Sequence, residues 1–452
     1  MALKTIILAA GKGTRMKSNL PKVLHPVAGK PMLHHVVEAA SSLGGDITIV
    51  YGHGGDQVKD KSTQINLKWA EQVEQLGTGH AVQQAQSSIE DDDTVLILYG
   101  DVPLTNPQTL KKLVSKSSKH VLALLTVKLD KPTGYGRIIR QNNNVERIVE
   151  QKDASEAELL VTEVNTGILA VNGQHLKRWL SKLQSNNAQG EFYLTDIIEM
   201  AVNDGVLVET VSPDSEFEVM GVNSKRELNI VERHYQKTQA EALMDMGVTL
   251  ADANRIDIRG ELDIQGTDIY IDVNCVFEGK VTLGSHVNIA ANCNMTNTML
   301  ADGVTVKPNS VLEDCRVGEN SSIGPYARLR PGAVLNKNVH VGNFVEIKKT
   351  NVGDGSKISH LSYIGDAEIG KAVNIGAGTI TCNYDGVSKF KTIIEDDVFI
   401  GSDTQLVAPV VVKKGATIGA GTTLTKTAPE GELTLSRAKQ ITLKGWKKPT
   451  KD

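Results

Sequence analysis

The sequence predicts two architectures in one chain: a doubly wound, Rossmann-like α/β domain, followed by a left-handed parallel β-helix of hexapeptide repeats. The first half alternates short apolar β runs with helical patterns. The second half repeats aliphatic residues with a period of six. The composition agrees, because 41 glycines and only 4% aromatic residues suit a turn-rich, repetitive β structure.

Composition and charge exclude several classes of protein. A chain of 452 residues predicts two or three domains. The formal net charge of -4 argues against a general nucleic-acid-binding protein, which needs a basic surface. The four cysteines lie in the second half without a CxxC pair, which favours a reducing compartment over a disulfide framework or a zinc site. No apolar run is long enough to span a membrane, so we expect a cytoplasmic protein without membrane insertion.

Residues 1–224 form the predicted α/β domain. Continuous apolar runs indicate strands buried on both faces, as in a mostly parallel sheet. The expected strands are Lys4–Ala10, Ile47–Tyr51, Thr94–Tyr99 and Val121–Val127, and the expected helices are Pro31–Leu43 and Gly79–Ile89. In such a sheet, ligands bind beyond the carboxyl ends of the strands.

Residues 225–247 lack proline and end at Gly247, which predicts a long helix. Two interpretations stay open: a helix that links two domains, or the last helix of the first domain.

Residues 248–452 form the predicted β-helix. Each hexad supplies one flat side, its aliphatic residue points inward, and stacked coils bury a continuous apolar column. The inward positions include Ile271, Phe277, Leu283, Ile289, Val317, Ile323, Leu329, Leu335, Val341, Ile347, Val352, Ile358, Ile364, Ile369, Ile375, Ile394, Ile400, Leu406, Val412 and Ile418. Residues 381–393 interrupt the period and are expected to leave the coil as a loop, where functional groups often lie.

Two elements of the first half suggest phosphate and metal chemistry. The glycine-rich turn Ala9–Gly13 follows a strand, and its N–H groups could hold an anion beside Arg15 and Lys22. Asp101 follows the apolar run Thr94–Tyr99 and could bind Mg²⁺. Taken alone, the glycines are better explained by a simple turn, and a turn-forming aspartate explains Asp101 equally well.

Several motifs together resemble the sugar-nucleotide pyrophosphorylases. They are Leu8–Arg15, Lys22, Glu74–Thr78, Tyr99–Asp101, Gly134–Arg137, Asn165–Gly167 and Gly221–Asn223. In the second half, Gly342–Glu346 and Cys382–Gly386 narrow the resemblance. The whole chain is similar to the bacterial bifunctional N-acetylglucosamine-1-phosphate uridyltransferases/glucosamine-1-phosphate acetyltransferases.

For the first half, this resemblance implies transfer of uridylyl from UTP to N-acetylglucosamine 1-phosphate, with release of pyrophosphate. Lys22 and Arg15 would be the catalytic cations, and Asp101 and Asn223 would bind Mg²⁺. The nucleotide sugar would lie against Leu8, Ala9, Ala10, Gly11, Lys22, Gln72, Gly77, Thr78, Tyr99, Gly100, Asp101, Gly136, Glu150, Asn165 and Asn223. Without the resemblance, Asn165 and Asn223 would be interpreted as asparagines that cap the backbone.

For the second half, the resemblance implies transfer of acetyl from acetyl-CoA to glucosamine 1-phosphate. This step precedes uridylyl transfer, and the final product, UDP-N-acetylglucosamine, is a precursor of peptidoglycan and lipopolysaccharide. His360 would be the general base, since histidine has an ordinary pKa of about 6.5. A solvated or packed histidine is the alternative. The acceptor would bind Arg330, Lys348, Tyr363, Asn374 and Lys389, and acetyl-CoA would bind Ala377, Asn383, Tyr384, Ser402, Ala420 and Arg437. The resemblance also implies a homotrimer.

Three other functions fit parts of the sequence. A β-helix can be a zinc enzyme of the γ-carbonic anhydrase type, although His286, His340 and His360 are widely spaced here. The first half could merely sense nucleotide sugars in a regulatory scaffold, but the combination of Lys22, Asp101, Asn223 and His360 argues against this. A pyrophosphorylase with a purely structural β-helix is the third, and the interruption at residues 381–393 together with His360 argues against it.

Overall fold

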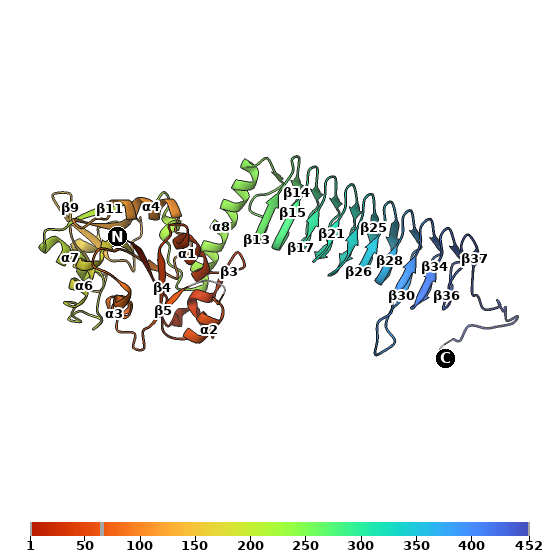
Figure 1. Cartoon of the computed structure of the whole chain (residues 1–452), viewed down its shortest axis with the longest axis horizontal. Helices are drawn as coiled ribbons and strands as arrows, with labels where there is room; N and C mark the ends of the chain where they lie inside the picture. The colour runs from red at the N-terminus through yellow and green to blue at the C-terminus, as the bar shows by residue number, and fades with distance from the viewer. Residues whose placement is uncertain (1, 64–66, 451–452) are drawn as a thin grey trace. The chain divides into compact units, whose positions relative to one another are not determined.

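The structure is a computed structural model that describes residues 2–63 and 67–450 (Figure 1). Its chain divides into two units, Met1–Tyr235 and Gln236–Asp452. The division falls within one long helix, α8 (Lys225–Asp245). In the described part of the chain, no helix combines the length and apolar character that a membrane crossing requires.

The first unit is an α/β domain in which helices cover both faces of a twisted sheet. The main sheet runs in the order β11 (Leu207–Val211), β7 (Val121–Lys128), β10 (Glu163–Asn172), β6 (Thr94–Tyr99), β1 (Leu3–Leu8), β4 (Asp46–Tyr51) and β5 (Lys68–Glu71). Its neighbours pair in parallel, except that β10 runs antiparallel to β6 and β7. A hairpin of β8 (Arg137–Gln141) and β9 (Asn144–Val149) joins it through β10, and β2 (Pro26–Val27) pairs separately with β3 (Lys30–Pro31).

Two apolar cores, one on each face of this sheet, hold the helices. The helices that contribute to one core are α1 (Met32–Ser41), α2 (Gly55–Asp60) and α4 (Pro107–Lys116). Those that contribute to the other are α3 (Thr78–Gln84), α6 (Gly173–Leu180) and α7 (Asp196–Asn203). A short helix, α5 (Glu156–Leu159), follows β9 and begins with a capping box at Ser155. The central strands are buried on both faces, as the apolar runs predict.

The second unit is a parallel β-helix of stacked coils (Figure 1). One flat side, the one-sided sheet, consists of β12 (Thr249–Leu250), β14 (Tyr270–Ile271), β16 (Asn288–Ile289), β19 (Thr305–Val306), β22 (Ser322–Ile323), β25 (His340–Asn343), β27 (Lys357–His360), β29 (Asn374–Ile375), β32 (Phe399–Ile400), β35 (Thr417–Ile418) and β37 (Leu433–Thr434). All of the inward positions expected from the period of six are buried in one continuous core.

The other flat sides form a single two-sided sheet, because some strands run through a corner without a break. Its strands are β13 (Ile256–Ile264), β15 (Cys275–Leu283), β17 (Asn294–Thr296), β18 (Met299–Leu300), β20 (Val311–Glu313), β21 (Arg316–Val317), β23 (Arg328–Leu329), β24 (Val334–Leu335), β26 (Glu346–Val352), β28 (Tyr363–Ile369), β30 (Ile380–Cys382), β31 (Thr392–Ile394), β33 (Gln405–Val407), β34 (Val410–Val412) and β36 (Thr423–Leu424). β28, for example, pairs with both β30 and β31.

The interruption of the period is a loop between β30 and β31, shorter at both ends than the predicted residues 381–393. Thr381 and Thr392 belong to the strands that flank it. Figure 1 shows this loop projecting from the stacked coils near β30. The coil therefore stays in register on both sides of the excursion.

The second half of α8 covers the first coil of the β-helix. Ala240 and Leu243 are buried in its apolar core. Gln236 makes two hydrogen bonds to the backbone of Ile258 on β13: its Nε2 donates to the carbonyl at 2.8 Å, and its Oε1 accepts from the N–H at 2.7 Å. These bonds satisfy backbone groups at an edge strand that would otherwise be buried without partners.

We predict that Gln236→Leu destabilises β13, because both backbone groups of Ile258 lose their partner at a cost of about 3 kcal/mol. Hydrogen exchange of β13, followed by mass spectrometry, should be faster than in the parent. Lys237→Leu, at the next and exposed position of α8, is the control and should exchange as the parent does. Equal protection of β13 in both variants would contradict this account of the helix.

Candidate functional site

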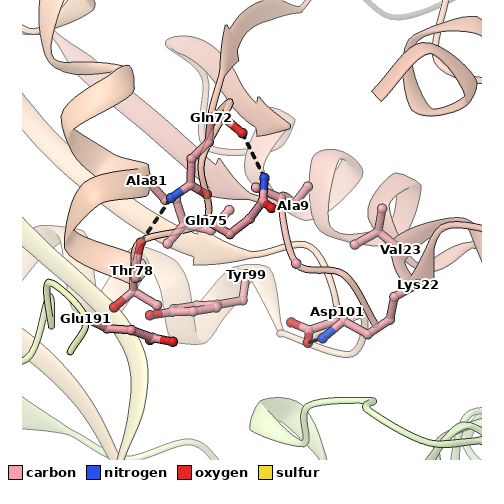
Figure 2. Close-up of a pocket in the computed structure, with 14 residues that line it drawn as sticks. Ala9, Lys22, Val23, Gln72, Gln75, Thr78, Ala81, Tyr99, Asp101 and Glu191 are labelled. Atoms are coloured by element: carbon pink, nitrogen blue, oxygen red, sulfur yellow. Dashed lines mark hydrogen bonds and ion pairs between the residues drawn. The ribbon is translucent and has the colours of Figure 1, made fainter. Parts of the chain in front are cut away.

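The first unit has a pocket beyond the carboxyl ends of β1 and β6, where a parallel sheet places its ligands. The pocket encloses about 220 Å³. It is lined by Leu8, Ala9, Ala10, Gly11, Lys22, Val23, Gln72, Gln75, Gly77, Thr78, Ala81, Tyr99, Asp101 and Glu191. In Figure 2, Lys22 and Asp101 meet on one side of it, and Thr78, Tyr99 and Glu191 lie on the other.

The glycine-rich turn lies directly against Lys22. Gly13 has φ of 58°, in the left-handed region. A Cβ atom at this position would lie 2.7 Å from the Cβ of Lys22, so a side chain has no room there. Glycine is therefore required for contact between the turn and Lys22, as well as for the backbone conformation.

Lys22 brings the two predicted metal ligands together. Its Nζ forms a short ion pair with Asp101 and donates a hydrogen bond to Asn223 Oδ1 at 3.0 Å. Both side chains of the ion pair are largely buried, at 13% and 14% exposure. The carboxylate and the amide oxygen thus converge on one cationic group, and such hard oxygen ligands suit Mg²⁺. The donor set fits the ion, with the lysine ammonium standing where a cation is expected.

Backbone bonds fix the segment that carries Asn223. The Val222 N–H donates to the carbonyl of Asp101 at 2.9 Å, which ties this segment to the end of β6. The Asn223 N–H donates to Glu227 Oε2 at 2.8 Å, within the first turn of α8. Asn223 therefore keeps its side chain for Lys22 instead of capping the helix.

The predicted sugar-binding residues gather beside Tyr99. Gly167 has φ of 83°, and a Cβ there would lie 2.4 Å from the Tyr99 ring. The Asn165 N–H donates to the Gly136 carbonyl at 2.9 Å, while its side-chain oxygen accepts from the Gly167 N–H at 2.9 Å. The side-chain oxygen of Asn165 therefore caps a backbone N–H group, as expected for this residue without the resemblance. Gly136 lies against Glu150, whose Oε1 would be 3.3 Å from a Cβ at Gly136.

Burial perturbs the acids of this region. Burial raises the pKa of Glu150, although the hydroxyl of Thr195 donates to its carboxylate at 3.1 Å and opposes the shift. Burial, followed by the charges of Glu150 and Asp101, raises the pKa of the Tyr99 hydroxyl far above neutrality, so Tyr99 is a donor at physiological pH. Asp196, at the start of α7, has its pKa raised by burial to about 6.

The pocket contains some of the predicted residues and adds others. Gly100, Gly136, Glu150, Asn165 and Asn223 are not among its lining residues, and Arg15 is exposed on the 3₁₀ turn Thr14–Met16. The lining residues that we did not predict are Val23, Gln75, Ala81 and Glu191. Gln75 belongs to the Glu74–Thr78 motif and could have been found there, whereas no sequence signal marks Glu191.

In the second unit, one column of residues runs across successive coils at the end of the one-sided sheet. Asn343 on β25 pairs with His360 on β27. The registers of β27, β29, β32 and β35 continue the column through Ala377, Ser402 and Ala420. At its far end, Arg437 Nε donates to the Ala420 carbonyl at 3.2 Å. Several residues predicted to bind acetyl-CoA thus share a column with His360.

A cluster of three cations lies on the adjacent two-sided sheet. Arg330 directly follows β23, and Lys348 lies at the paired position on β26. Lys389 belongs to the excursion loop and contacts Lys348. The ammonium of Lys389, followed by the charge of Arg330, lowers the pKa of Lys348. Glu346 accepts a bond from Arg330 at 2.7 Å and offsets part of the charge. Such a cluster suits a dianionic phosphate.

The remaining predicted residues lie on either side of these two groups. Tyr363 begins β28, three positions after His360. Asn383, on the excursion loop, donates to Asp366 Oδ2 at 2.5 Å, and Tyr384 is exposed beside it. Asn374 begins β29 on the one-sided sheet. One chain therefore does not bring Asn374 together with Tyr363 and Lys348, which lie on the two-sided sheet.

No three His, Cys, Asp or Glu side chains in residues 2–63 and 67–450 gather in a group that could hold a metal ion. All four cysteines are free thiols.

Comparison with known proteins agrees with this division of the chain. Residues 5–157 match the MobA-like NTP transferase domain, residues 260–352 match the GMPPB C-terminal domain, and residues 391–426 match six bacterial transferase hexapeptide repeats. A nucleotidyl transferase from Methanothermobacter thermautotroptrophicus is 18% identical, with a TM-score of 0.40, over 52% of this chain and 99% of its own. A UDP-glucose pyrophosphorylase complexed with UDP-glucose is 18% identical, with a TM-score of 0.43, over 53% of this chain and 100% of its own.

The predicted fold class is confirmed. The first unit contains a nucleotidyltransferase domain with a Rossmann-like α/β fold, and the second is a β-helix of transferase hexapeptide repeats.

We predict that Gly13→Ala weakens nucleotide binding at least about tenfold, because the new Cβ displaces Lys22 and the left-handed backbone is strained. Isothermal titration with UTP and Mg²⁺ measures the effect. Gly44→Ala is the matched control: its φ is 77°, but a Cβ would meet nothing within 4 Å. Equal loss of affinity in both variants would mean that strain alone is responsible.

Proposed function

We propose that the chain is a cytoplasmic bifunctional enzyme that makes UDP-N-acetylglucosamine. The second unit would transfer acetyl from acetyl-CoA to glucosamine 1-phosphate. The first would transfer uridylyl from UTP to the resulting N-acetylglucosamine 1-phosphate. The cluster of Arg330, Lys348 and Lys389 carries this proposal, because a purely structural coil gains nothing by holding three like charges together.

In the first reaction, a phosphate oxygen of the sugar phosphate attacks the α-phosphorus of UTP. The bond to the β-phosphate oxygen breaks and pyrophosphate leaves. Phosphoryl transfer of this kind depends on positioning and charge neutralisation. The turn up to Gly13 would offer backbone N–H groups to the phosphates. Lys22, which lies against this turn, would neutralise part of their charge. Mg²⁺ held by Asp101 and Asn223 would supply further neutralisation.

The sugar would bind beside Tyr99. Its protonated hydroxyl can donate to the sugar, and the Glu150 carboxylate, which packs against Gly136, can accept from sugar hydroxyls. Asn165 would align this wall through its bonds to Gly136 and Gly167. Such polar groups suit a polyhydroxylated ligand better than an apolar one.

In the second reaction, the amine of glucosamine 1-phosphate attacks the thioester carbonyl of acetyl-CoA. His360 accepts the amine proton, the new C–N bond forms, and the C–S bond breaks to release CoA. The three cations would hold the phosphate. Acetyl-CoA would lie along the column of Ala377, Ser402 and Ala420, whose small side chains leave room for it, with Asn383, Tyr384 and Arg437 beside them.

The proposal includes a homotrimer, and two observations support self-association. Tyr326, Phe344 and Leu361 occupy one corner of successive coils with 53%, 55% and 61% exposure, and the first two rings stack at 5.4 Å. Such a contiguous apolar corner suits burial against another protein surface. A second copy could also bring its Asn374 to the Tyr363 and Lys348 of the first.

The assay that tests both activities supplies glucosamine 1-phosphate, acetyl-CoA, UTP and Mg²⁺, and follows free CoA and pyrophosphate together. The parent should form both products. His360→Ala should lose at least about 100-fold in CoA release and still form pyrophosphate when given N-acetylglucosamine 1-phosphate. Asp101→Ala should lose pyrophosphate formation by at least about 100-fold and keep CoA release.

Each site is thereby the control for the other, because a global folding defect would reduce both products. If pyrophosphate forms but CoA never appears, the β-helix is structural or acylates another acceptor. If neither product forms with any supplied sugar phosphate, the sensing scaffold replaces this proposal.

Lys389→Met should raise the KM for glucosamine 1-phosphate about 5- to 10-fold, because the phosphate loses one of its three cations. The matched control is Lys391→Met on the same loop. Lys391 pairs with Glu368 at 2.7 Å, away from Lys348, and its removal should change the KM less than about twofold. Similar effects in both variants would show that loop charge in general, and not the cluster, attracts the substrate.

A further inference from the structure

His360 makes one side-chain contact, with Asn343, to which no function has been assigned above. His360 Nδ1 is 2.7 Å from Asn343 Oδ1. We propose that Asn343 is a positioning residue for His360: its oxygen holds the proton of the ring on Nδ1 and leaves Nε2 free to accept a proton. This inference rests on the proposed acetyltransferase function.

The coil geometry fixes the two side chains relative to each other. Asn343 ends β25 and His360 ends β27, and the two residues are direct partners in the parallel register. The Asn343 carbonyl accepts from the Leu361 N–H at 3.0 Å, so its backbone is bonded to the corner that follows His360. Parallel neighbours about 4.8 Å apart bring a short amide and an imidazole into hydrogen-bonding distance without distortion.

Gly342 permits this close approach. A Cβ at Gly342 would lie 1.9 Å from the carbonyl oxygen of Ser359, so a larger residue would separate the two coils at this point. The hydroxyl of Ser362, itself buried, donates to the His360 carbonyl at 2.8 Å. The backbone on both sides of His360 is therefore held, and the ring orientation is left to the side-chain contact.

The chemistry of the two groups determines the tautomer. An amide oxygen can only accept a hydrogen bond, and a neutral imidazole carries one N–H. The contact at Nδ1 therefore places the hydrogen there, and the lone pair of a potential base lies on Nε2. When Nε2 takes a proton, Nδ1–H remains bonded to the same oxygen, so one geometry serves both protonation states of the ring.

The other neighbour of His360 in the column cannot take this role. That residue is Ala377, whose methyl group forms no hydrogen bond. Orientation of the ring from within the column therefore depends on Asn343.

The test compares Asn343→Leu, which removes the oxygen, with Asn343→Asp, which keeps one. The ¹⁵N shifts of the His360 ring are recorded in the full chain at about pH 8.5, where an ordinary imidazole is neutral. His360→Gln identifies the signals among the 11 histidines. The parent and Asn343→Asp should carry the proton on Nδ1, and Asn343→Leu should show a mixture of tautomers.

The kcat/KM for CoA release should fall about 10- to 100-fold in Asn343→Leu and be largely kept in Asn343→Asp. Pyrophosphate formation from supplied N-acetylglucosamine 1-phosphate should not change in either. Asn294→Leu, at an exposed position of β17, controls for an added leucine on the coil surface.

A proton on Nε2 in the parent, or an unchanged tautomer in Asn343→Leu, would overturn the inference. If the proton lies on Nε2 in the parent and moves to Nδ1 in Asn343→Asp, the amide N–H of Asn343 faces the ring and the inference is wrong. These outcomes are distinct from failure of the proposed function: in that case the parent releases no CoA, or His360→Ala keeps CoA release, while the ring shifts still report the tautomer.

Discussion

The stacking of coils is the constraint on which the second unit depends. A single coil exposes its inward aliphatic residues to the coils above and below, so no coil can bury them alone. The inward column is buried from Ile271 to Ile418, and α8 closes its beginning with Ala240 and Leu243. Because every coil must repeat the same geometry, any side chain at a given corner is placed over its equivalent in the next coil.

This repetition explains how side chains from different coils are brought side by side on the surface of the β-helix. His360 inherits its place from the register that also places Asn343, Ala377 and Ser402. Arg330 and Lys348 are neighbours for the same reason, one sheet away. Only Lys389 comes from outside the repeat, on the loop that interrupts it. The regular coil thus positions the first two side chains, and the loop brings in a third side chain that the repeat could not place there.

The sequence predicted the parts of the structure that depend on local pattern. The apolar runs gave β1, β6 and β7, and the period of six predicted the inward positions of the coil. The hairpin β8–β9 and strand β10 were not predicted, although β10 contains the apolar run Ile168–Val171. Local pattern also does not show that β10 runs antiparallel to its neighbours. Contacts between distant residues were also beyond pattern analysis: Lys22 meets Asp101 across 79 positions and Asn223 across 201.

The same limit applies to the candidate sites. Resemblance pointed to Lys22, Asp101 and His360, but it did not indicate that the Lys22 ammonium contacts both predicted metal ligands. Asn343 was visible only as part of the Gly342–Glu346 motif, because its relation to His360 depends on the length of a coil. Glu191 lines the pocket from a loop between α6 and α7, where neither composition nor spacing marks it.

At the corner of Tyr326, Phe344 and Leu361, the stability of the isolated chain and the presence of an exposed apolar surface favour different residues. Equivalent corners of the earlier coils carry Asn274, Asn292 and Asn309, which tolerate the left-handed backbone. The bulky residues adopt φ of 53°, 54° and 46° instead, at about 1 kcal/mol or more each. Substitution of these residues by asparagine or glycine would therefore raise the stability of the isolated chain, but it would remove the exposed apolar corner. Engineering for heat resistance would therefore favour other residues at these three positions than the self-association proposed above.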